Sequence, residues 1–578
     1  MKSFKDLKHN LKSELSSLPI IKVSLLGDTS TQLLATAIRG TAVERGYYID
    51  LFEAEFNQVE RQLLDSSSDL FSFDPEFIII FQSTHKLAEL HSLSSEKEKV
   101  ADNRLSFLSV VCDNPVLSEK KIICFNYPEI DDTVFGSYAN KIHSSLLYQV
   151  RKLNNGLMAL ADRYPNLFIC DISSIQNKYG RDFMFSSNVY TSTEMVLSID
   201  SLPFVASRVL DIICSIKGRF KKCLILDLDN TLWGGVIGDD GLDGIQLGHG
   251  LGIGKAFSEF QMWIKKLRER GIIICVASKN DEAIAREPFE KHPDMVLKLD
   301  DIAVFMANWE TKVDNIRAIQ GVLNIDFDSM VFVDDNPFER SIVRENIQGI
   351  TVPELPEDPG DYLEYLYSLN LFETASFSVN DKNRTKQYQD EAQRISLAKT
   401  FTNESDFLQS LNMSSAVSGF TSFNIPRVAQ LSQRSNQFNL RTIRYTEAEV
   451  AEIAKRQDII DLSFTLEDKF GDNGLIAVVI LRPIDKETLF VDTWLMSCRV
   501  LKRGMEYFTL NTIVERAKSA GYKRIIGEYL PTAKNKMVES HFPDLGFQKI
   551  EGQDTNRYIL DINTYHPKQC FIEKRQGL

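Results

Sequence analysis

The strongest constraint on the fold lies in the middle of the chain, where the apolar run Cys223–Leu226 passes directly into Asp227-Leu-Asp-Asn-Thr231. A short continuous apolar run is typical of a strand that is buried on both faces of a parallel sheet. Side chains that follow such a strand lie at the carboxyl edge of the sheet, where α/β proteins bind ligands. The segment therefore predicts an α/β domain in which Asp227 and Asp229 face one crevice.

Apolar runs alternate with helical patterns along the rest of the chain, which predicts a multidomain α/β protein. The strands expected before residue 215 are Ile21–Leu26, Phe77–Phe81, Lys121–Phe125 and Leu167–Cys170, with a helical pattern over Tyr138–Tyr164. In the middle of the chain they are Cys223–Leu226, Ile272–Val276 and Met330–Val333. Towards the end they are Ile459–Leu466, Leu475–Leu481, Thr488–Trp494 and Arg524–Glu528, with a helix over Gly504–Ala520.

These patterns divide the chain into four expected segments. Residues 1–215 and 216–360 each read as an α/β domain, and the prolines of Val352–Gly360 end the second one because proline interrupts regular structure. Residues 361–399 read as a charged helical connector. Several strands followed by a long helix make residues 400–578 an expected α+β domain.

Composition excludes several classes of protein. The formal net charge is −14, so a nucleic-acid partner is not expected. No apolar run approaches about 18 uncharged residues, and Met1–Ile20 lacks the apolar core of a signal peptide, so no membrane partner is expected. The eight cysteines form no paired metal-binding motif, which favours a reducing cytoplasm.

Further polar residues follow the next expected strands of the middle domain. Ser278 and Asn280 follow Ile272–Val276 and offer a hydroxyl and an amide to a phosphate group, and Lys312 offers a point charge. Asp334 and Asp335 follow Met330–Val333 and add two carboxylates suited to Mg²⁺. Each feature alone is common; taken alone, Asp334-Asp335 reads as a solvated loop or a helix cap.

In this order, each at the end of a strand, the residues closely resemble the four motifs of the haloacid dehalogenase (HAD) superfamily. The resemblance implies Asp227 as nucleophile and Asp229 as general acid/base, with phosphate contacts from Ser278 and Lys312. It further implies the roles of the remaining residues: Thr231 and Asn280 at the phosphate loop, and Asp227, Asp229, Asp334 and Asp335 around Mg²⁺. The short stretch between Asp229 and Ser278 leaves no room for a large cap, so a capless, Rossmann-like domain is expected.

Longer matches identify a more specific family, the FkbH-like proteins of HAD subfamily IIIC. The matching segments are Leu226–Gly241, Val331–Arg340, Val352–Pro359, Asp468–Gly474, Leu495–Leu501 and Gly527–Asn535. Members of this family take a glyceryl unit from 1,3-bisphosphoglycerate, remove phosphate and load the unit onto an acyl-carrier-protein thiol. The resemblance therefore implies a phosphorylated three-carbon acyl donor and an acyl carrier protein or phosphopantetheine thiol as partners.

The C-terminal domain resembles the GNAT acyltransferases. The strand Thr488–Trp494 leads through Cys498 and Arg499 to a helix, and Arg499 and Arg503 are expected to hold a phosphopantetheine phosphate at the helix N-terminus. The same positive surroundings would lower the pKa of Cys498 and make it an acyl-accepting thiol. Alternatively, Cys498 only packs at a strand end. His541 is expected at a helix end or on the surface and not as a base.

Near the N-terminus, Gly27-Asp28-Thr29-Ser30 resembles the first block of SGNH hydrolases, with Thr29 in place of the nucleophilic serine. The expected fold is a three-layer α/β domain. A hydrolase of this kind needs a base within hydrogen-bonding reach of its nucleophile. His85 is the only nearby candidate and its surroundings do not match the family, so a degenerate, non-catalytic domain is expected.

The leading hypothesis is thus a phosphatase that also passes a glyceryl unit to a carrier thiol. A plain phosphatase is the first alternative. A CoA-dependent N-acyltransferase fused to a phosphatase in polysaccharide biosynthesis is the second. A non-catalytic assembly protein is the third, and the complete set Asp227, Asp229, Ser278, Lys312 and Asp334 speaks against it.

Overall fold

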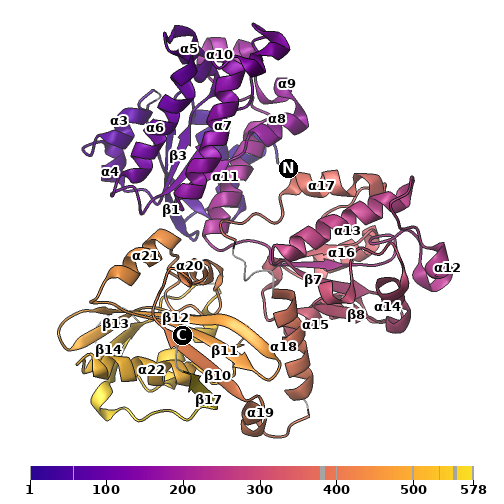
Figure 1. Ribbon diagram of the computed structural model, residues 1–578, viewed down its shortest axis with the longest axis vertical. Helices are drawn as coiled ribbons and strands as arrows, with labels where there is room; N and C mark the ends of the chain where they lie inside the picture. Colours follow the sequence, from indigo (N-terminus) through magenta and orange to yellow (C-terminus); the bar gives the residue numbers. More distant parts are fainter. Residues whose placement is uncertain are drawn as a thin grey trace. The chain divides into compact units, whose positions relative to one another are not determined.

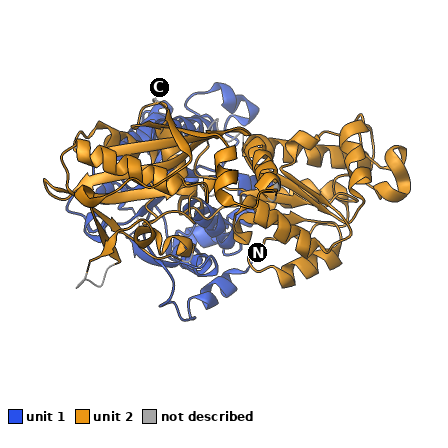
Figure 2. Cartoon of the chain, turned by 90° about the horizontal axis from the view of Figure 1, so that it is seen from below, with its two compact units in different colours: residues 1–214 blue, residues 215–578 orange. Residues whose placement is uncertain are grey.

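The computed structural model describes residues 2–55, 57–377, 384–398, 400–497, 500–532, 534–550 and 556–575. The chain divides into two compact units, residues 1–214 and 215–578, which Figure 2 distinguishes by colour. Each unit is a separate arrangement of sheets and helices. Among the residues that the structure describes, no helix is long and apolar enough to cross a membrane.

Unit 1 contains one parallel sheet covered by helices on both faces (Figure 1). Its strands, in the order β2-β1-β3-β4-β5, are Tyr48–Glu53, Ile20–Gly27, Phe77–Phe81, Lys121–Phe125 and Leu167–Cys170. Ile78 and Ile80 pack with residues of α6 (Val100–Asp113) and α7 (Leu146–Arg163) on one face. Leu25 and Ile79 point to the opposite face and are equally buried. The expected three-layer α/β arrangement is confirmed.

Two elements of unit 1 differ from the sequence-based expectation. Strand β2 was not predicted, because it lies at the edge of the sheet and most of its residues are only half-buried. The helix expected over Tyr138–Tyr164 begins later, at Leu146, where the Ser145 hydroxyl accepts a hydrogen bond from the Tyr148 amide and caps the helix.

The first half of unit 2 contains a second parallel sheet with helices on both faces. Its strands, in the order β8-β7-β6-β9, are Val304–Ala307, Ile273–Ser278, Cys223–Leu226 and Met330–Val333. The helices α13 (Ile253–Glu269) and α14 (Glu282–Lys291) cover one face; α15 (Lys312–Leu323) and α16 (Pro337–Asn346) cover the other. Only the short α12 (Ile237–Gly244) and α13 separate β6 from β7, as expected for a capless domain. The short edge strand β8 was not predicted.

The expected connector over 361–399 forms two helices with different surroundings. Helix α17 (Tyr362–Leu369) buries Tyr362 and Leu366 in the same core as α13, so it is part of the first half of unit 2. Helix α18 (Arg384–Ala398) contacts α15, β7 and β8, and also contacts β12 of the next sheet. The segment therefore packs against both sheets of unit 2 and is not a free linker.

The last sheet of unit 2 is mixed and has eight strands, in the order β15-β16-β14-β13-β12-β11-β10-β17. In that order the strands are Gln548–Lys549, Arg557–Asp561, Arg524–Glu528, Thr488–Met496, Gly471–Pro483, Ile460–Asp468, Met413–Ser418 and Ile572–Arg575. One face packs on α22 (Met505–Ser519), the other on α20 (Ile425–Arg434) and α21 (Glu447–Lys455). The α+β class is confirmed, although β10, β15, β16 and β17 were not predicted.

Candidate functional site

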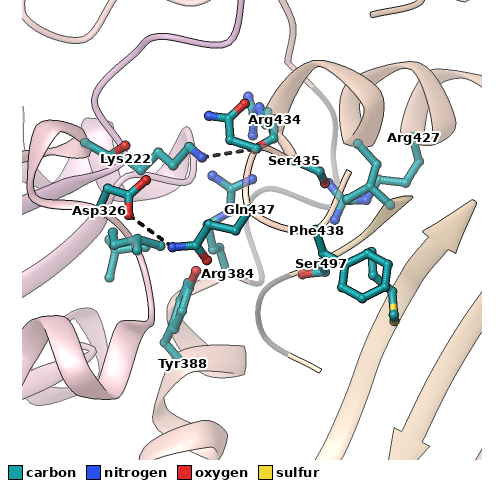
Figure 3. Close-up of a pocket in the computed structure, with 16 residues that line it drawn as sticks. Lys222, Asp326, Arg384, Tyr388, Arg427, Arg434, Ser435, Gln437, Phe438 and Ser497 are labelled. Carbon is teal, nitrogen blue, oxygen red and sulfur yellow. Dashed lines mark hydrogen bonds between the residues drawn. The ribbon is translucent and has the colours of Figure 1, made fainter. Parts of the chain in front are cut away.

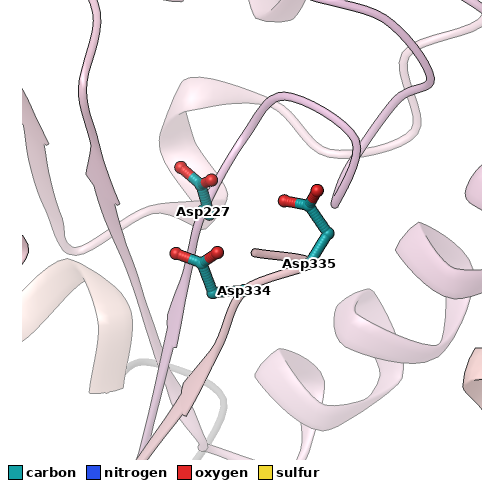
Figure 4. A group of neighbouring side chains, drawn as sticks. All are labelled: Asp227, Asp334 and Asp335. Carbon is teal, nitrogen blue, oxygen red and sulfur yellow. The ribbon is translucent and has the colours of Figure 1, made fainter. Parts of the chain in front are cut away.

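Three carboxylates meet at the carboxyl edge of the parallel sheet of unit 2 (Figure 4). Leu226 and Val333 are partners in the register of the neighbouring strands β6 and β9, so Asp227 and Asp334 follow them side by side. One oxygen from each of Asp227, Asp334 and Asp335 lies within 4.8 Å of the others. The structure thus brings together acidic residues from two separate strand ends.

Lys312 places an ammonium between two of these carboxylates. It is the first residue of α15, whose N-cap Thr311 accepts a hydrogen bond from the amide of Asp314. The Nζ atom lies 2.7 Å from Oδ2 of Asp227 and 2.6 Å from Oδ2 of Asp334. Burial opposes the charged form of Lys312, but the two carboxylates outweigh it and raise the lysine pKa. Burial, and next the charge of Asp227, raise the pKa of Asp334 to about 7.

The cluster fits a divalent cation. One ammonium faces three carboxylates in a buried setting, and like charges held this closely repel one another. Oδ1 of Asp227 is buried and has no hydrogen-bond partner within the described part of the chain, so a ligand atom remains available. Carboxylate oxygens are the ligands that Mg²⁺ prefers.

Asp229 lies next to the cluster and is held by three donors. Its Oδ1 accepts hydrogen bonds from the indole of Trp233 and the amide of Ile237, both at 2.9 Å. Its Oδ2 accepts one from Nδ2 of Asn280 at 2.8 Å. Burial raises the pKa of Asp229, and these hydrogen bonds partly offset the increase. Asn280, expected at the phosphate, therefore orients Asp229 in this structure.

The remaining motif residues fix the loops around the cluster. Ser278 is the last residue of β7 and is buried. The hydroxyl of Thr231 accepts a hydrogen bond from the amide of Asp335 at 3.1 Å and so ties the two acidic loops together. Arg340, which sequence reasoning missed as a site residue, donates to the carbonyls of Asp334 and Asp335 at 2.8 and 2.6 Å. The signal was its place in the matching segment Val331–Arg340.

Two large aromatic side chains are exposed on the loops that follow the outer strands of this sheet. Trp309, between β8 and α15, is 78% exposed, and Phe338, at the start of α16, is 66% exposed. Strands β8 and β9 are the two edges of the sheet, with the strands that carry Asp227 and Ser278 between them. The aromatic residues thus follow the two edge strands of the sheet, of which β9 also leads into Asp334 and Asp335 of the acid cluster.

The residues expected at a C-terminal acyl site are only partly within the structure. Cys498 and Arg499 lie outside the described residues. Arg503 is buried, and its guanidinium pairs with Glu391 and, at 3.2 Å, with Asp468. In this structure the charge of Arg503 is matched by these two carboxylates, and its contact with a phosphopantetheine phosphate stays a prediction.

A small cavity of about 70 Å³ lies between the two sheets of unit 2 (Figure 3). The charged residues of its lining are mostly basic: Lys222, Arg384, Arg427 and Arg434, together with Asp326. Lys222 precedes β6, whereas Asp227 follows it, so this cavity lies at the opposite end of the strand from the acid cluster. The cavity is therefore not part of the acid cluster.

In unit 1, the residues that resemble an SGNH site do not form a catalytic pair. The Thr29 hydroxyl is buried and makes no hydrogen bond to any residue that the structure describes, His85 included. The ring of His85 packs against Phe185 and Tyr190, and burial lowers its pKa to about 4. Both carboxylate oxygens of Asp28 accept from the amide of Ser83, and burial raises its pKa to about 7.

Comparisons with known proteins found relatives of several parts of the chain. The family model "FkbH, N-terminal domain" matches residues 22–214. The crystal structure of the N-terminal part of the protein BF1531 from Bacteroides fragilis, described as containing a phosphatase domain complexed with Mg, is 62% identical, with a TM-score of 0.64. The match covers 65% of this chain and 100% of that one.

Weaker matches cover the C-terminal quarter of the chain. The ribosomal-protein-S18-alanine N-acetyltransferase of Escherichia coli is 13% identical over 27% of this chain and 98% of its own, with a TM-score of 0.21. The GNAT domain of S. lividans PAT is 22% identical over 25% of this chain and 89% of its own, with a TM-score of 0.21. A search of curated proteins found no match.

Proposed function

The chain belongs to the FkbH-like family, and we propose that it is a magnesium-dependent phosphatase whose catalytic centre is the acid cluster of unit 2. One observation carries the proposal: Asp227 and Asp334, from two strand ends, meet around the Lys312 ammonium. The phosphatase domain of the Bacteroides fragilis relative, which was crystallised with Mg, supports the same assignment.

Asp227, Asp334 and Asp335 would hold the magnesium ion. When bound, such an ion neutralises carboxylate and phosphoryl charges that otherwise repel each other. Lys312 supplies a second positive charge for the phosphoryl oxygens and pairs with the Asp227 carboxylate. Thr231 and Arg340 hold the two acidic loops in place.

The proposed reaction proceeds in two displacements. A carboxylate oxygen of Asp227 attacks phosphorus, the bond to the leaving oxygen breaks, and Asp229 gives its proton to that oxygen. Water then attacks phosphorus, gives a proton to Asp229, and frees the Asp227 carboxylate and inorganic phosphate. Asn280, Trp233 and the Ile237 amide hold Asp229 in position for both proton transfers.

We further propose that the donor is 1,3-bisphosphoglycerate and that the glyceryl unit passes to the thiol of an acyl carrier protein. The thiol sulfur attacks the acyl carbon, the bond from carbon to the phosphate oxygen breaks, and the thiol proton goes to solvent. The products are a 3-phosphoglyceryl thioester and the phosphate from C1, and the acid cluster then hydrolyses the C3 phosphate ester to leave the glyceryl thioester. Family membership supports this step, as does the absence of a cap between β6 and β7 in these described residues, since a bulky carrier needs an open site.

The proposal assigns a role to each segment of the chain. Residues 216–360 would carry the phosphatase, 361–399 would join it to the C-terminal domain, and 400–578 would transfer the acyl group, with Cys498 as the candidate thiol. Residues 1–215 would be a non-catalytic SGNH-like domain, which the missing bond between Thr29 and His85 supports.

One observation favours the alternative of a plain phosphatase. The ion pairs of Arg503 remove one of the two arginines expected at a phosphopantetheine phosphate. Under this alternative, the C-terminal domain would only recognise the substrate.

The two functions are separated by incubating the protein with 1,3-bisphosphoglycerate and a carrier protein, followed by intact-mass measurement and a phosphate assay. Wild type should release phosphate and add a glyceryl unit to the carrier. Asp227→Asn should abolish release of the C3 phosphate, so that the carrier adduct stays phosphorylated, whereas Asp162→Asn, the same change at an exposed site in unit 1, should not. Phosphate release without a carrier adduct would establish the plain phosphatase, and Cys498→Ala should block loading alone.

A further inference from the structure

The C-terminal half of unit 2 contains a second cavity, of about 660 Å³, away from the acid cluster. It is lined by the beginning of α22, by α23 (His541–Asp544), by part of α19 (Glu404–Ser410) and by residues 569–571. Leu501 and Lys502, which follow Cys498 closely in the sequence, also line it. Its volume is in the range of small-molecule sites, roughly 300 to 1,000 Å³.

His541 gives this cavity an unusual polar group. The side chain was expected at a helix end or on the surface; it begins α23 but is only 7% exposed. Its ring packs against those of Trp494 and Phe438, with centroid distances of 4.5 and 4.9 Å. Nε2 is buried and makes no hydrogen bond to any of the described residues. Burial lowers the pKa of His541 to about 3, so the imidazole is neutral.

An unsatisfied buried nitrogen has a cost, about 1–3 kcal/mol in general. A ligand in the cavity can remove that cost by supplying the missing partner. The rest of the lining mixes apolar residues, among them Phe438, Leu501, Val538 and Leu545, with charged ones, and among these described residues the three acidic ones, Glu404, Glu506 and Asp544, outnumber the single cation Lys502. The cavity therefore suits an uncharged chain with a hydrogen-bonding group and disfavours a phosphate.

We propose that this cavity binds the acyl group on its thioester chain, and that His541 selects acyl groups that carry a hydroxyl. The inference rests on the acyl transfer proposed above and names the substrate that this site accepts. A hydroxyl both donates and accepts, so it can satisfy Nε2 in either tautomer of the ring. A phosphorylated acyl group is excluded by its charge, which places phosphate removal before binding in this cavity.

The test compares three preformed pantetheine thioesters: dihydroxypropanoyl, its phosphorylated form, and propanoyl. Wild type should transfer the dihydroxypropanoyl group to a carrier with a kcat/KM at least about tenfold above the kcat/KM for the propanoyl group. Sites built to bind a hydroxyl discriminate strongly against substrates that lack it. The phosphorylated thioester should be transferred poorly. His541→Leu should lower the ratio of the dihydroxypropanoyl kcat/KM to the propanoyl kcat/KM to about one. His541→Gln should recover part of the preference.

A purely structural role for His541 would lower both rates together, and an unchanged preference in His541→Leu would overturn the proposal. Preformed thioesters bypass phosphate removal, so Asp227→Asn should retain the full preference. If no thioester is transferred at all, the acyl-transfer function has failed, and the cavity is tested by binding alone. Cys570, half-buried in its lining, should then be protected from alkylation by the dihydroxypropanoyl thioester at lower concentrations than by propanoyl. Equal protection, or none, would refute the assignment.

Discussion

The Lys312 ammonium and the Asp227 carboxylate form an ion pair at 2.7 Å, and the lysine side chain is only 3% exposed. The same ammonium lies 2.6 Å from Asp334. A charge this deeply buried is tolerated only when it is paired. Lys312 is therefore both a candidate phosphate ligand and the counter-ion that keeps two neighbouring carboxylates together.

Replacing Lys312 with methionine should separate these two roles. Without the ammonium, buried Asp227 and Asp334 face each other uncompensated, and removal of one partner of such a pair costs about 3–5 kcal/mol. We expect phosphate release to be lost and the melting temperature to fall, with Mg²⁺ restoring part of the stability but not the activity. An equal loss of stability with and without Mg²⁺ would contradict the shared metal site.

Chelation should reveal the metal directly. Treatment with EDTA is expected to abolish phosphate release and to lower the melting temperature, because a ligand bound only to the folded state stabilises it by about 2.7 kcal/mol at a hundredfold excess over its Kd. Re-addition of Mg²⁺ should restore both. Asp334→Asn should lose the thermal response to Mg²⁺, whereas the exposed-site variant Asp162→Asn should keep it.

Trp309→Ala should affect substrate binding and not stability. The indole is largely exposed, and exposed aromatic groups beside a catalytic site commonly contact a partner. We expect the KM for a carrier-linked phosphorylated substrate to rise several-fold, with little change for a small phosphate ester. The free energy of unfolding should change by less than about 0.5 kcal/mol. Phe423→Ala, at an equally exposed position in the C-terminal half of unit 2, is the matched control.

Arg503→Met should destabilise unit 2. Arg503 shares Asp468 with Arg394, whose Nε lies 2.7 Å from that carboxylate, and all three side chains are buried. We expect a loss of about 3–5 kcal/mol in the free energy of unfolding, measured by denaturant titration. If Arg503 bound a phosphate instead, the variant would retain its stability and lose carrier loading.

The stability of unit 1 should depend on pH through Asp28. Because burial raises its pKa from 3.8 to about 7, the folded protein binds the proton more tightly than the unfolded chain between these values. The contribution of Asp28 to the free energy of unfolding therefore falls as pH rises from about 4 to 7, by about 1.4 kcal/mol per pKa unit at most. Asp28→Asn should show a correspondingly weaker pH dependence in thermal melts. An unaltered pH profile would exclude a buried, titrating Asp28.

The acid cluster could be predicted because each of its residues directly follows an apolar run in the sequence. Each of β6, β7 and β9 is a continuous apolar run that ends in polar residues, and parallel strands bring such ends to one edge. The edge strand β2 lacked this signal, since its half-buried residues mix polar and apolar types, and the apolar edge strand β8 is only four residues long. The C-terminal strands β10 and β17 pair across a long stretch of sequence, which no local pattern reports.

The surroundings of two C-terminal residues could not be read from the sequence. Arg503 was expected to bind an anion from its sequence neighbours alone, whereas its partner Glu391 comes from a helix distant in the sequence. His541 was expected at a helix end or on the surface; it does begin α23, but Trp494 and Phe438 enclose its ring and bury it. Tertiary packing sets the charged partners and the burial of these side chains. The sequence alone therefore does not predict them.

Helix α18 has one further consequence. Its Tyr388 lies in the core beneath the phosphatase sheet, and Arg394, further along the same helix, is paired with Asp468 at the end of β11. Rotating one sheet against the other would have to break one of these buried attachments. We therefore expect that, in the proposed reaction, the acyl group moves from the phosphatase site to the C-terminal site on a flexible carrier such as phosphopantetheine. Rotation of the two sheets of unit 2 against each other is not expected to bring the sites together.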